Sequence, residues 1–214
     1  YSQGFKGGGF DPRGQTTQAL DLDGDGVDAD DIYEYMAFEP EQDGAIGAVI
    51  GHEISHGFDD QGAQFDAQGR LRNWWTFEDN EKFQERGQCV VDQFEGYFIE
   101  PGIHHNGKLV LGESIGDLAG AKLAYLGYQK SRVGKGPEPT IDGFTPEQQF
   151  FIAWGQFRGD AIRIETQRTM VQGDPHPIAK YRVNGPLSNL PAFREAFQCK
   201  AGDPMVREGT DLCE

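Results

Sequence analysis

The stretch GAVIGHEISHGFDDQG at residues 47–62 constrains this chain most, because it places two histidines one helical turn apart in an apolar run. His52 and His56 are four positions apart, so in an α-helix both imidazoles project from the same side. Glu53 lies about 100° further round, beside the histidine face. This H-E-x-x-H order is typical of a zinc-binding helix whose glutamate acts as a base. A buried helix with two hydrogen-bonded histidines remains an equally good explanation at this point.

The same helix has an apolar side. Ile46, Ile50 and Ile54 recur at helical spacing and fall roughly opposite the imidazoles. We therefore expect a helix that is buried through its isoleucines and presents its histidines to a cleft. Gly47 and Gly51 each cost about 1 kcal/mol relative to alanine in a helix interior, so they predict that another segment packs closely here.

LVLGESIGDLAGAKLAYLGY at residues 109–128 predicts a second helix, beginning near residue 113. Glu113 and Asp117 share one face. The small residues around that face are Gly116, Gly120, Ala121 and Ala124. Two histidines and a carboxylate form a zinc set with the fourth tetrahedral position open. Glu113 would complete that set and Asp117 would orient a ligand imidazole. The alternative is that both carboxylates are ordinary residues near a helix N-terminus, favoured there by the helix dipole.

Such a site has a definite chemistry. Zinc lowers the pKa of a bound water to about 7, and Glu53 is placed to accept its proton and pass it to a leaving amine. The oxyanion of a peptide carbonyl then needs further donors. His176 and Arg182 in PHPIAKYRVNG (175–185) are candidates, in a predicted Pro-bounded loop that leads into an Asn-Gly turn at 184–185. Taken alone, a histidine and an arginine in a loop are usually surface residues.

The rest of the chain alternates helical patterns with Gly- and Pro-rich stretches. EDNEKFQERGQCVVDQFEGYF (78–98) has apolar residues at helical spacing. TPEQQFFIAWGQF (145–157) opens with Thr145 as N-cap, Pro146 at the first helical position and Gln148 closing a capping box. The adjacent His104 and His105 are expected at the surface, since neighbours in sequence do not share a face. The sequence predicts a mainly α domain, of α+β class, with a few short strands.

The formal net charge of −16 over 214 residues argues against a nucleic-acid partner or an anionic membrane surface, because both need basic patches. No apolar run approaches the roughly 20 residues of a membrane span.

Five motifs in order resemble the catalytic portion of the neprilysin family of zinc metallopeptidases, peptidase family M13. They are GAVIGHEISHGFDDQG, LRNWWT (71–76), NGKLVLGESIGD (106–117), HPIAKYRVNG (176–185) and AFQCKAGDPM (196–205). The resemblance covers about residues 44–213 and implies a thermolysin-like zincin domain. We expect residues 44–214 to form the catalytic domain and residues 1–43 to be an atypical N-terminal segment.

The resemblance also implies a role for each matching residue. His52, His56 and Glu113 would bind zinc, Glu53 would be the general base, and Asp117 would orient a zinc histidine. His176 would stabilise the oxyanion, Arg182 would hydrogen-bond the substrate backbone, and Val49 and Trp154 would help line an apolar pocket for the residue after the cut bond.

Departures from the family pattern concern the N-terminal part. The family's helical cap and its Asn-Ala-Tyr-Tyr segment have no counterpart in residues 1–43. We therefore expect the chain to be a fragment or one piece of a processed enzyme, whose partners are peptide substrates and a separate N-terminal chain or segment.

The chain has three cysteines. The resemblance pairs Cys89 with Cys213, which would contribute about 4–5 kcal/mol by the chain-entropy estimate. It assigns Cys199 a partner in the missing N-terminal part. This favours an extracellular or periplasmic location; the alternative is three free thiols in a reducing compartment.

The acidic segment DLDGDGVDADD (21–31) raises the possibility of calcium. Positions 1, 3, 5 and 6 of a calcium-binding loop are matched by Asp21, Asp23, Asp25 and Gly26. Position 12, where a bidentate glutamate is expected, falls on Ile32. A solvated acidic linker explains the composition equally well.

Three functions follow from these observations. The first, which we prefer, is a zinc endopeptidase that cuts oligopeptides on the amino side of hydrophobic residues. The second is a catalytically silent zinc-binding scaffold, and the third is a calcium-dependent interaction module. Intact Glu53, Asp117, His176 and Arg182 favour the first, because a scaffold would not need all four.

Overall fold

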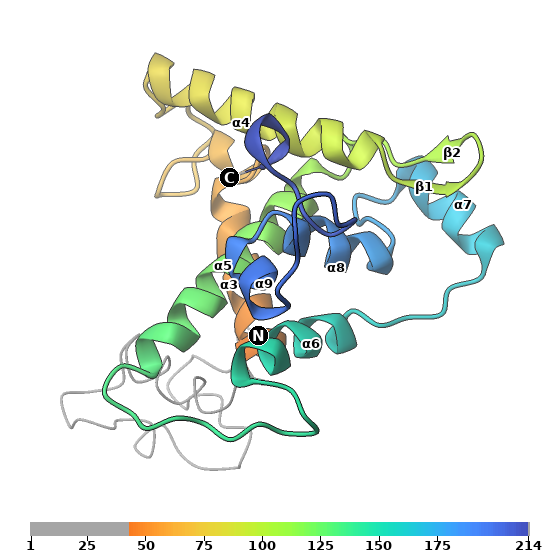
Figure 1. Ribbon diagram of the computed structural model, residues 1–214. Coiled ribbons are helices and arrows are strands. Elements are labelled where there is room, and N and C mark those ends of the chain that lie inside the picture. Colours follow the sequence, from red (N-terminus) through yellow and green to blue (C-terminus); the bar gives the residue numbers. More distant parts are fainter. Residues whose placement is uncertain (1–42, 214) are drawn as a thin grey trace, which may run out of the picture.

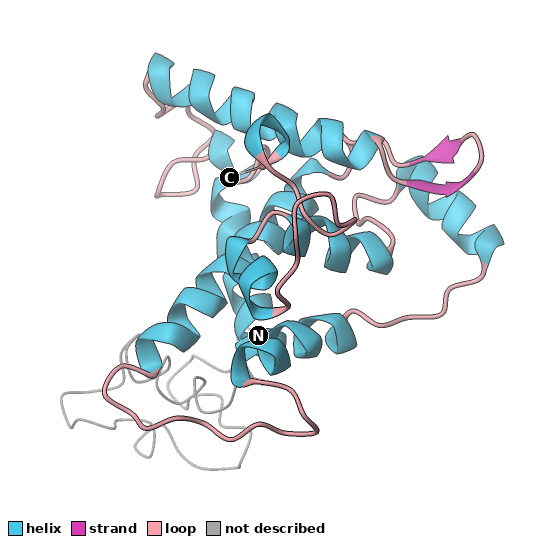
Figure 2. Cartoon of the chain, in the orientation of Figure 1, coloured by secondary structure: helices cyan, strands magenta, loops and turns pink. Residues whose placement is uncertain are grey.

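Helices dominate residues 43–213, the part of the chain that this computed structural model describes (Figures 1 and 2). The α-helices are α3 (Ala48–Ser55), α4 (Phe77–Glu95), α5 (Leu111–Ser131), α6 (Pro146–Phe157), α7 (Ile164–Gly173), α8 (Ala179–Ser188) and α9 (Pro191–Ala196). The π-helical turn η2 (Asp43–Gly47) leads into α3, and the 3₁₀ turns are η3 (His56–Phe58), η4 (Gly62–Gln64) and η5 (Gly209–Asp211). Strands β1 (Phe98–Glu100) and β2 (Ile103–His104) form an antiparallel hairpin. The predicted mainly α domain with few short strands is confirmed.

Helices α3 and α5 form the central pair of the fold, and their backbones touch (Figure 1). A Cβ atom added to Gly51 would lie 2.9 Å from the Cα of Gly120, and one added to Gly120 would lie 2.4 Å from the carbonyl oxygen of Ala48. Both distances are shorter than a Cβ tolerates, so only glycine permits this approach. The close packing predicted from Gly51 and from the small residues around Glu113 is therefore present.

The predicted orientation of α3 was wrong. Ile54 is 63% exposed, whereas Ala48, Gly51, His52 and Ser55 are buried against the rest of the protein. The small side chains bring α3 nearer to α5 than isoleucines would, so side-chain size rather than hydrophobicity selects the buried face. His52 is buried on that face because it has carboxylate partners there.

An aromatic core lies beside this pair, between α5 and α6. Its largest buried side chains are Trp154, Phe150, Phe151, Tyr125 and Tyr128. The capping box that was predicted for the start of α6 is present, so α6 begins at a defined residue and carries its aromatic face into this core.

A second apolar cluster lies under α4, where Val90, Phe94 and Val110 pack around Cys213. Cys213 is bonded to Cys89 across 124 positions of sequence, which confirms the predicted pairing. Cys199 forms no disulfide, and no cysteine other than these three occurs in the chain.

Residues 179–185 are helical, so the loop predicted over 175–185 is present only over residues 175–178, and the predicted Asn-Gly turn was wrong. Helix α8 runs through this segment and contains Pro186. A Cβ on Gly185 would lie 2.9 Å from the Phe94 ring, and the Gly185 carbonyl accepts a hydrogen bond from Gln93 at 3.0 Å. This glycine therefore serves close packing against α4 and not a reversal of the chain.

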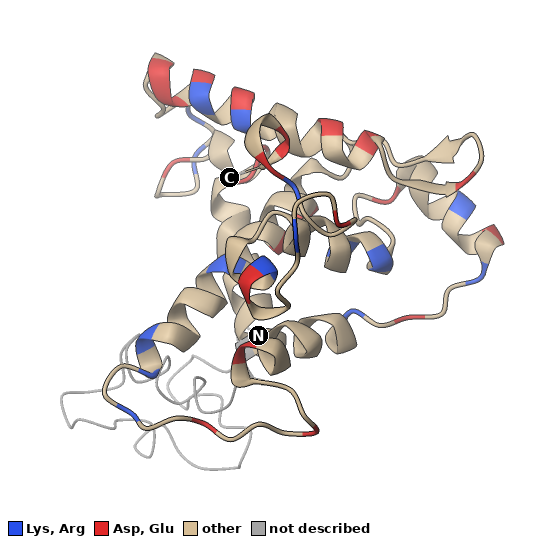
Figure 3. Ribbon diagram, viewed as in Figure 1, with Lys and Arg blue, Asp and Glu red and all other residues tan. Residues whose placement is uncertain are grey.

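Acidic and basic residues are mixed in the first half of α4, and only acidic ones occur in its second half (Figure 3). Among the described helices none is both long and apolar enough to cross a membrane. The calcium prediction for Asp21, Asp23 and Asp25 falls outside the described residues, as does nearly all of the predicted 1–43 segment.

Candidate metal centre

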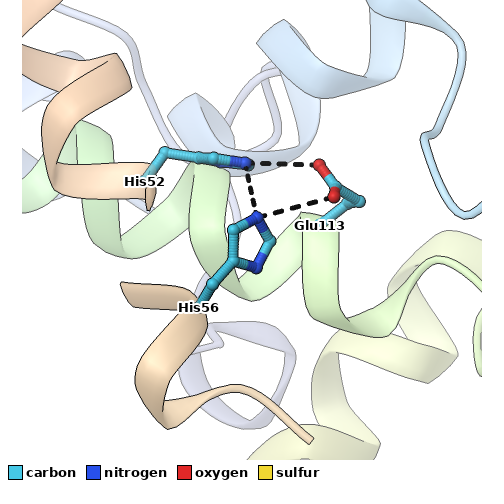
Figure 4. A group of neighbouring side chains, drawn as sticks. All are labelled: His52, His56 and Glu113. Atoms are coloured by element: carbon cyan, nitrogen blue, oxygen red, sulfur yellow. Dashed lines mark hydrogen bonds and ion pairs between the residues drawn. The ribbon is translucent and has the colours of Figure 1, made fainter. Parts of the chain in front are cut away.

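Three side chains from the central helix pair point at one another (Figure 4). His52 lies in the last turn of α3, His56 ends that helix, and Glu113 lies in the first turn of α5. The Nε2 atom of His52 is 3.1 Å from His56 Nε2 and 3.3 Å from Glu113 Oε2. His56 Nε2 is 3.5 Å from Glu113 Oε1. The structure thus brings together the three residues that were predicted to bind a metal.

The donor atoms are close enough together to share one ion. The two histidine–glutamate distances end on different oxygens of Glu113, and one donor atom from each of the three residues gives a set whose members all lie within 4.8 Å of one another. The distance of 3.1 Å between the two imidazole nitrogens is near the roughly 3.3–3.4 Å that separates ligand atoms about 2.0–2.1 Å from a tetrahedral zinc. Two imidazoles and one carboxylate are also the donor set of a catalytic zinc site, in which a fourth position stays open.

Asp117 stands behind His52 and is completely buried. Its Oδ1 atom lies 2.9 Å from His52 Nδ1. Arg182 donates from Nε to Oδ2 at 2.7 Å and from Nη2 to Oδ1 at 2.8 Å, and Arg158 Nη2 donates to Oδ1 at 2.9 Å. A charged group so deeply buried needs such partners, and the two guanidinium groups fix it in place. Arg158 was not predicted, because it lies 41 positions from Asp117 and no motif marks it.

His56 has a carboxylate partner of its own, Asp59, which was not predicted either. Its Oδ2 atom is 2.7 Å from His56 Nδ1, and its Oδ1 atom accepts from the backbone N–H groups of Gln61 and Gly62 at 2.9 and 2.7 Å. Asp59 is 5% exposed. The signal was in the sequence: Asp59 follows His56 by three positions, a spacing at which helical side chains meet.

The carboxylates and the imidazole shift each other's proton affinity. Burial by itself lowers the pKa of His52, but hydrogen bonds that its ring donates to Asp117 and Glu113 outweigh this effect and raise that pKa to about 9. Burial likewise raises the pKa of Glu113, but His52 and Arg182 hold it at about 2. Glu113 is therefore an anion at neutral pH, as a metal ligand must be.

Two further predicted residues lie at the same centre. Nε2 of His176 is 3.3 Å from Glu113 Oε1, and its ring is 47% exposed and held from the other side by Asp174 at 2.8 Å. Arg182 is buried and also donates to Glu113 at 2.9 Å. Glu53 is exposed, directly after His52 in α3. These contacts join α8 and the segment before it to α3 and α5.

The two pocket residues differ from one another. Trp154 is fully buried in the aromatic core, its Nε1 donates to the Arg182 carbonyl at 3.3 Å, and Arg158 lies over its ring. Val49 is partly buried in α3. Their role in binding a substrate side chain stays a prediction.

Comparison with known proteins agrees with this geometry. The family model of peptidase family M13 matches residues 26–213. Neprilysin-21 of Caenorhabditis elegans is 44% identical over 171 residues, which are 77% of this chain and 22% of that protein. Endothelin-converting enzyme 1 of Cavia porcellus is 40% identical over 164 residues, 76% of this chain and 22% of that protein. The chain thus spans about a fifth of the length of these relatives.

A solved structure is also similar. The zinc metalloprotease Zmp1 of Mycobacterium tuberculosis, in complex with an inhibitor, superposes with a TM-score of 0.78 at 38% identity. The match covers 82% of this chain and 27% of that one. By sequence and by fold, the chain belongs to peptidase family M13.

Proposed function

We propose that this chain is the zinc-binding part of a metalloendopeptidase that hydrolyses oligopeptides. The observation that carries the proposal is the group of His52, His56 and Glu113, whose donor atoms all lie within 4.8 Å of one another and are the donor set of a catalytic zinc site. When bound, zinc lowers the pKa of its water to about 7 and polarises the peptide carbonyl. Because the chain spans about a fifth of its relatives' length, the proposal concerns the metal centre and its immediate peptide contacts.

Glu53 is proposed as the general base and then the general acid. It is exposed and directly follows His52 in α3, which supports a role beside the metal rather than as a ligand to it. It accepts the proton of the attacking water and delivers it to the leaving amine. A proton shuttle of this kind is worth about 10²- to 10⁴-fold in rate.

His176 and Arg182 are proposed to act on the substrate. The His176 ring is exposed and lies 3.3 Å from Glu113, which supports a role as hydrogen-bond donor to the oxyanion that develops from the carbonyl. Arg182 uses Nε and Nη2 to hold Asp117 and Glu113, which leaves Nη1 to donate to a substrate carbonyl. Asp117 and Asp59 keep the two ligand imidazoles oriented.

Specificity and location extend the proposal. Val49 and Trp154 are proposed to shape an apolar pocket that favours cleavage on the amino side of hydrophobic residues. Equal kcat/KM for peptides with Phe or Asp after the cut bond would contradict this. The Cys89–Cys213 disulfide supports an oxidising location outside the cytosol. The separate N-terminal chain or segment, expected as a partner, stays a prediction.

Glu53→Gln tests the proposal. With a quenched peptide substrate and metal analysis, we expect the variant to keep about one zinc per chain while its kcat falls about 10²- to 10⁴-fold. Zinc binding without any cleavage by the unaltered protein would instead indicate a silent scaffold. Glu85→Gln, an exposed change in α4, is the matched control and should leave both quantities unchanged.

A further inference from the structure

His105 is buried although it was expected at the surface. It is 1% exposed, and both ring nitrogens have backbone partners. Nδ1 is 3.1 Å from the Tyr97 carbonyl oxygen, and Nε2 accepts from the Ile178 N–H at 3.1 Å. Because a carbonyl only accepts and an N–H only donates, these partners assign the proton to Nδ1 and the neutral imidazole to this site.

The hydrogen bond between His105 and the backbone N–H of Ile178 lies at the start of α8. Ile178 is the N-cap residue of that helix, and its carbonyl accepts from the N–H groups of Tyr181 and Arg182 at 2.7 and 3.2 Å. An isoleucine has no side-chain acceptor with which to cap a helix. Its own N–H, on a residue that is 4% exposed, is held by the imidazole. The first turn of α8 is therefore anchored from outside, by a residue 73 positions earlier in the chain.

The anchored residue lies between two groups that act on the substrate in the proposed function. His176 is two positions before Ile178, and Arg182 is four positions after it. Arg182 has its own strong attachment, through three hydrogen bonds to Asp117 and Glu113. His176 is half exposed and is held on its own segment by Asp174, so its position relative to Glu113 depends on where that segment is fixed.

We propose that His105 is a positioning residue of the peptidase site, which holds Ile178 so that His176 stays at the substrate carbonyl. The inference rests on the proposed function, because the role of His176 does. His105 touches neither metal ligands nor substrate; it acts through the backbone of the segment that it binds.

Other contacts keep α8 in place if the imidazole is lost. The Tyr181 hydroxyl donates to the Phe98 carbonyl, and its ring stacks on Tyr97 with centroids 4.4 Å apart. The Tyr97 carbonyl also accepts from the backbone N–H of His105 at 3.1 Å, whatever the side chain. Replacement of the ring therefore leaves one specific group without a partner, the Ile178 N–H.

Two substitutions at position 105 and one at position 104 test the proposal. His105→Leu keeps most of the volume and removes the acceptor. His105→Gln keeps an acceptor for Ile178 and a donor for Tyr97. His104→Leu removes an exposed neighbouring imidazole that does not contact Ile178, and is the control. Hydrogen exchange of the Ile178 amide, zinc content, and kcat and KM for a quenched peptide are measured on each.

We expect His105→Leu to lower the exchange protection of the Ile178 amide by about 10- to 100-fold. We expect kcat to fall by a similar factor, since a group displaced by about 1 Å costs up to about 100-fold, while KM and zinc content stay as in the unaltered protein. His105→Gln should recover much of both losses, and His104→Leu should show neither.

Each of these measurements can overturn the proposal for His105. Unchanged kcat in a folded His105→Leu protein overturns the proposal, and so does an equal loss in His104→Leu. If His105→Leu does not fold, His105→Gln must fold with a protected Ile178 amide, or the proposal fails. If the unaltered protein binds zinc and cleaves nothing, the proposed function fails, and exchange at Ile178 still shows whether His105 holds that residue.

Discussion

Replacement of Gly120 by alanine should disable the metal centre without altering any ligand. Gly120 lies on α5 where this helix touches α3. A Cβ there would be 2.4 Å from the Ala48 carbonyl oxygen and 2.6 Å from the His52 backbone nitrogen. Both obstacles are backbone atoms of a helix, so no side-chain rotation relieves them.

The size of the effect follows from these contacts. Ordinary contact begins at 3.4 Å, so the two helices must separate by about 1 Å. Two ligands lie at the end of α3 and the third on α5, so the His–Glu distances of 3.3 and 3.5 Å grow by a similar amount. Zinc coordination tolerates about 0.2 Å. Overpacking of this kind lowers the free energy of unfolding by about 1–3 kcal/mol. Loss of a hydrogen bond that supports a ligand weakens metal affinity by roughly 10- to 100-fold, and we expect the loss of zinc affinity here to be larger.

Competition with a chromophoric chelator measures that affinity, and urea denaturation measures stability. Gly87→Ala is the matched control: Gly87 lies inside α4, and its Cβ would meet only the Leu111 side chain at 3.8 Å. We expect this control to bind zinc normally and to be up to about 1 kcal/mol more stable. A Gly120→Ala protein that is folded and binds zinc as tightly as the control would refute the reasoning.

Three further predictions follow from the structure. Asp59→Asn should weaken zinc binding about 10- to 100-fold in the same chelator assay, because His56 loses the carboxylate that orients its ring; unchanged affinity would mean that the backbone alone positions His56. Replacing both Cys89 and Cys213 by serine opens a loop of 124 positions and should lower the free energy of unfolding by about 5 kcal/mol in urea, and a loss below about 1 kcal/mol would count against the chain-entropy account. Burial lowers the pKa of His105 from 6.5, so between the two pKa values the unfolded chain binds a proton that the folded chain excludes. The stability that is present above pH 6.5 is therefore lost as the pH falls toward the folded pKa. In a series of Tm measurements, the Tm of His105→Gln should fall less steeply with decreasing pH than that of the unaltered protein.

The sequence predicted which three side chains come together because the relevant information is local. His52 and His56 are one helical turn apart, Glu113 and Asp117 another, and spacing alone places each pair on one face. That the two faces meet was indicated by glycines such as Gly120, and the structure shows the contact. The capping box at the start of α6 is equally local and was also predicted.

Long-range contacts account for most of what the sequence did not predict. Arg158 bonds to Asp117 across 41 positions of sequence, and His105 bonds to Ile178 across 73. The periodicity of the sequence predicts neither hydrogen bond. The helical course of residues 179–185 depends on packing of Gly185 against Phe94, which overrides the local preference of an Asn-Gly pair for a turn. The outward orientation of Ile54 has the same origin, because the partner of α3 was chosen by the fit of small residues.

The charged cluster behind His52 determines how the protein depends on its ion. Glu113 and Asp117 carry two negative charges, and Arg158 and Arg182 carry two positive ones in direct contact with them. These fixed charges cancel before any cation arrives, so the scaffold does not require the ion as an internal counter-charge. Small zinc-nucleated domains, by contrast, are unfolded until they are loaded. We therefore expect that an ion bound at this centre can be removed and replaced by another, such as cobalt, without loss of the fold, which would open the centre to spectroscopy.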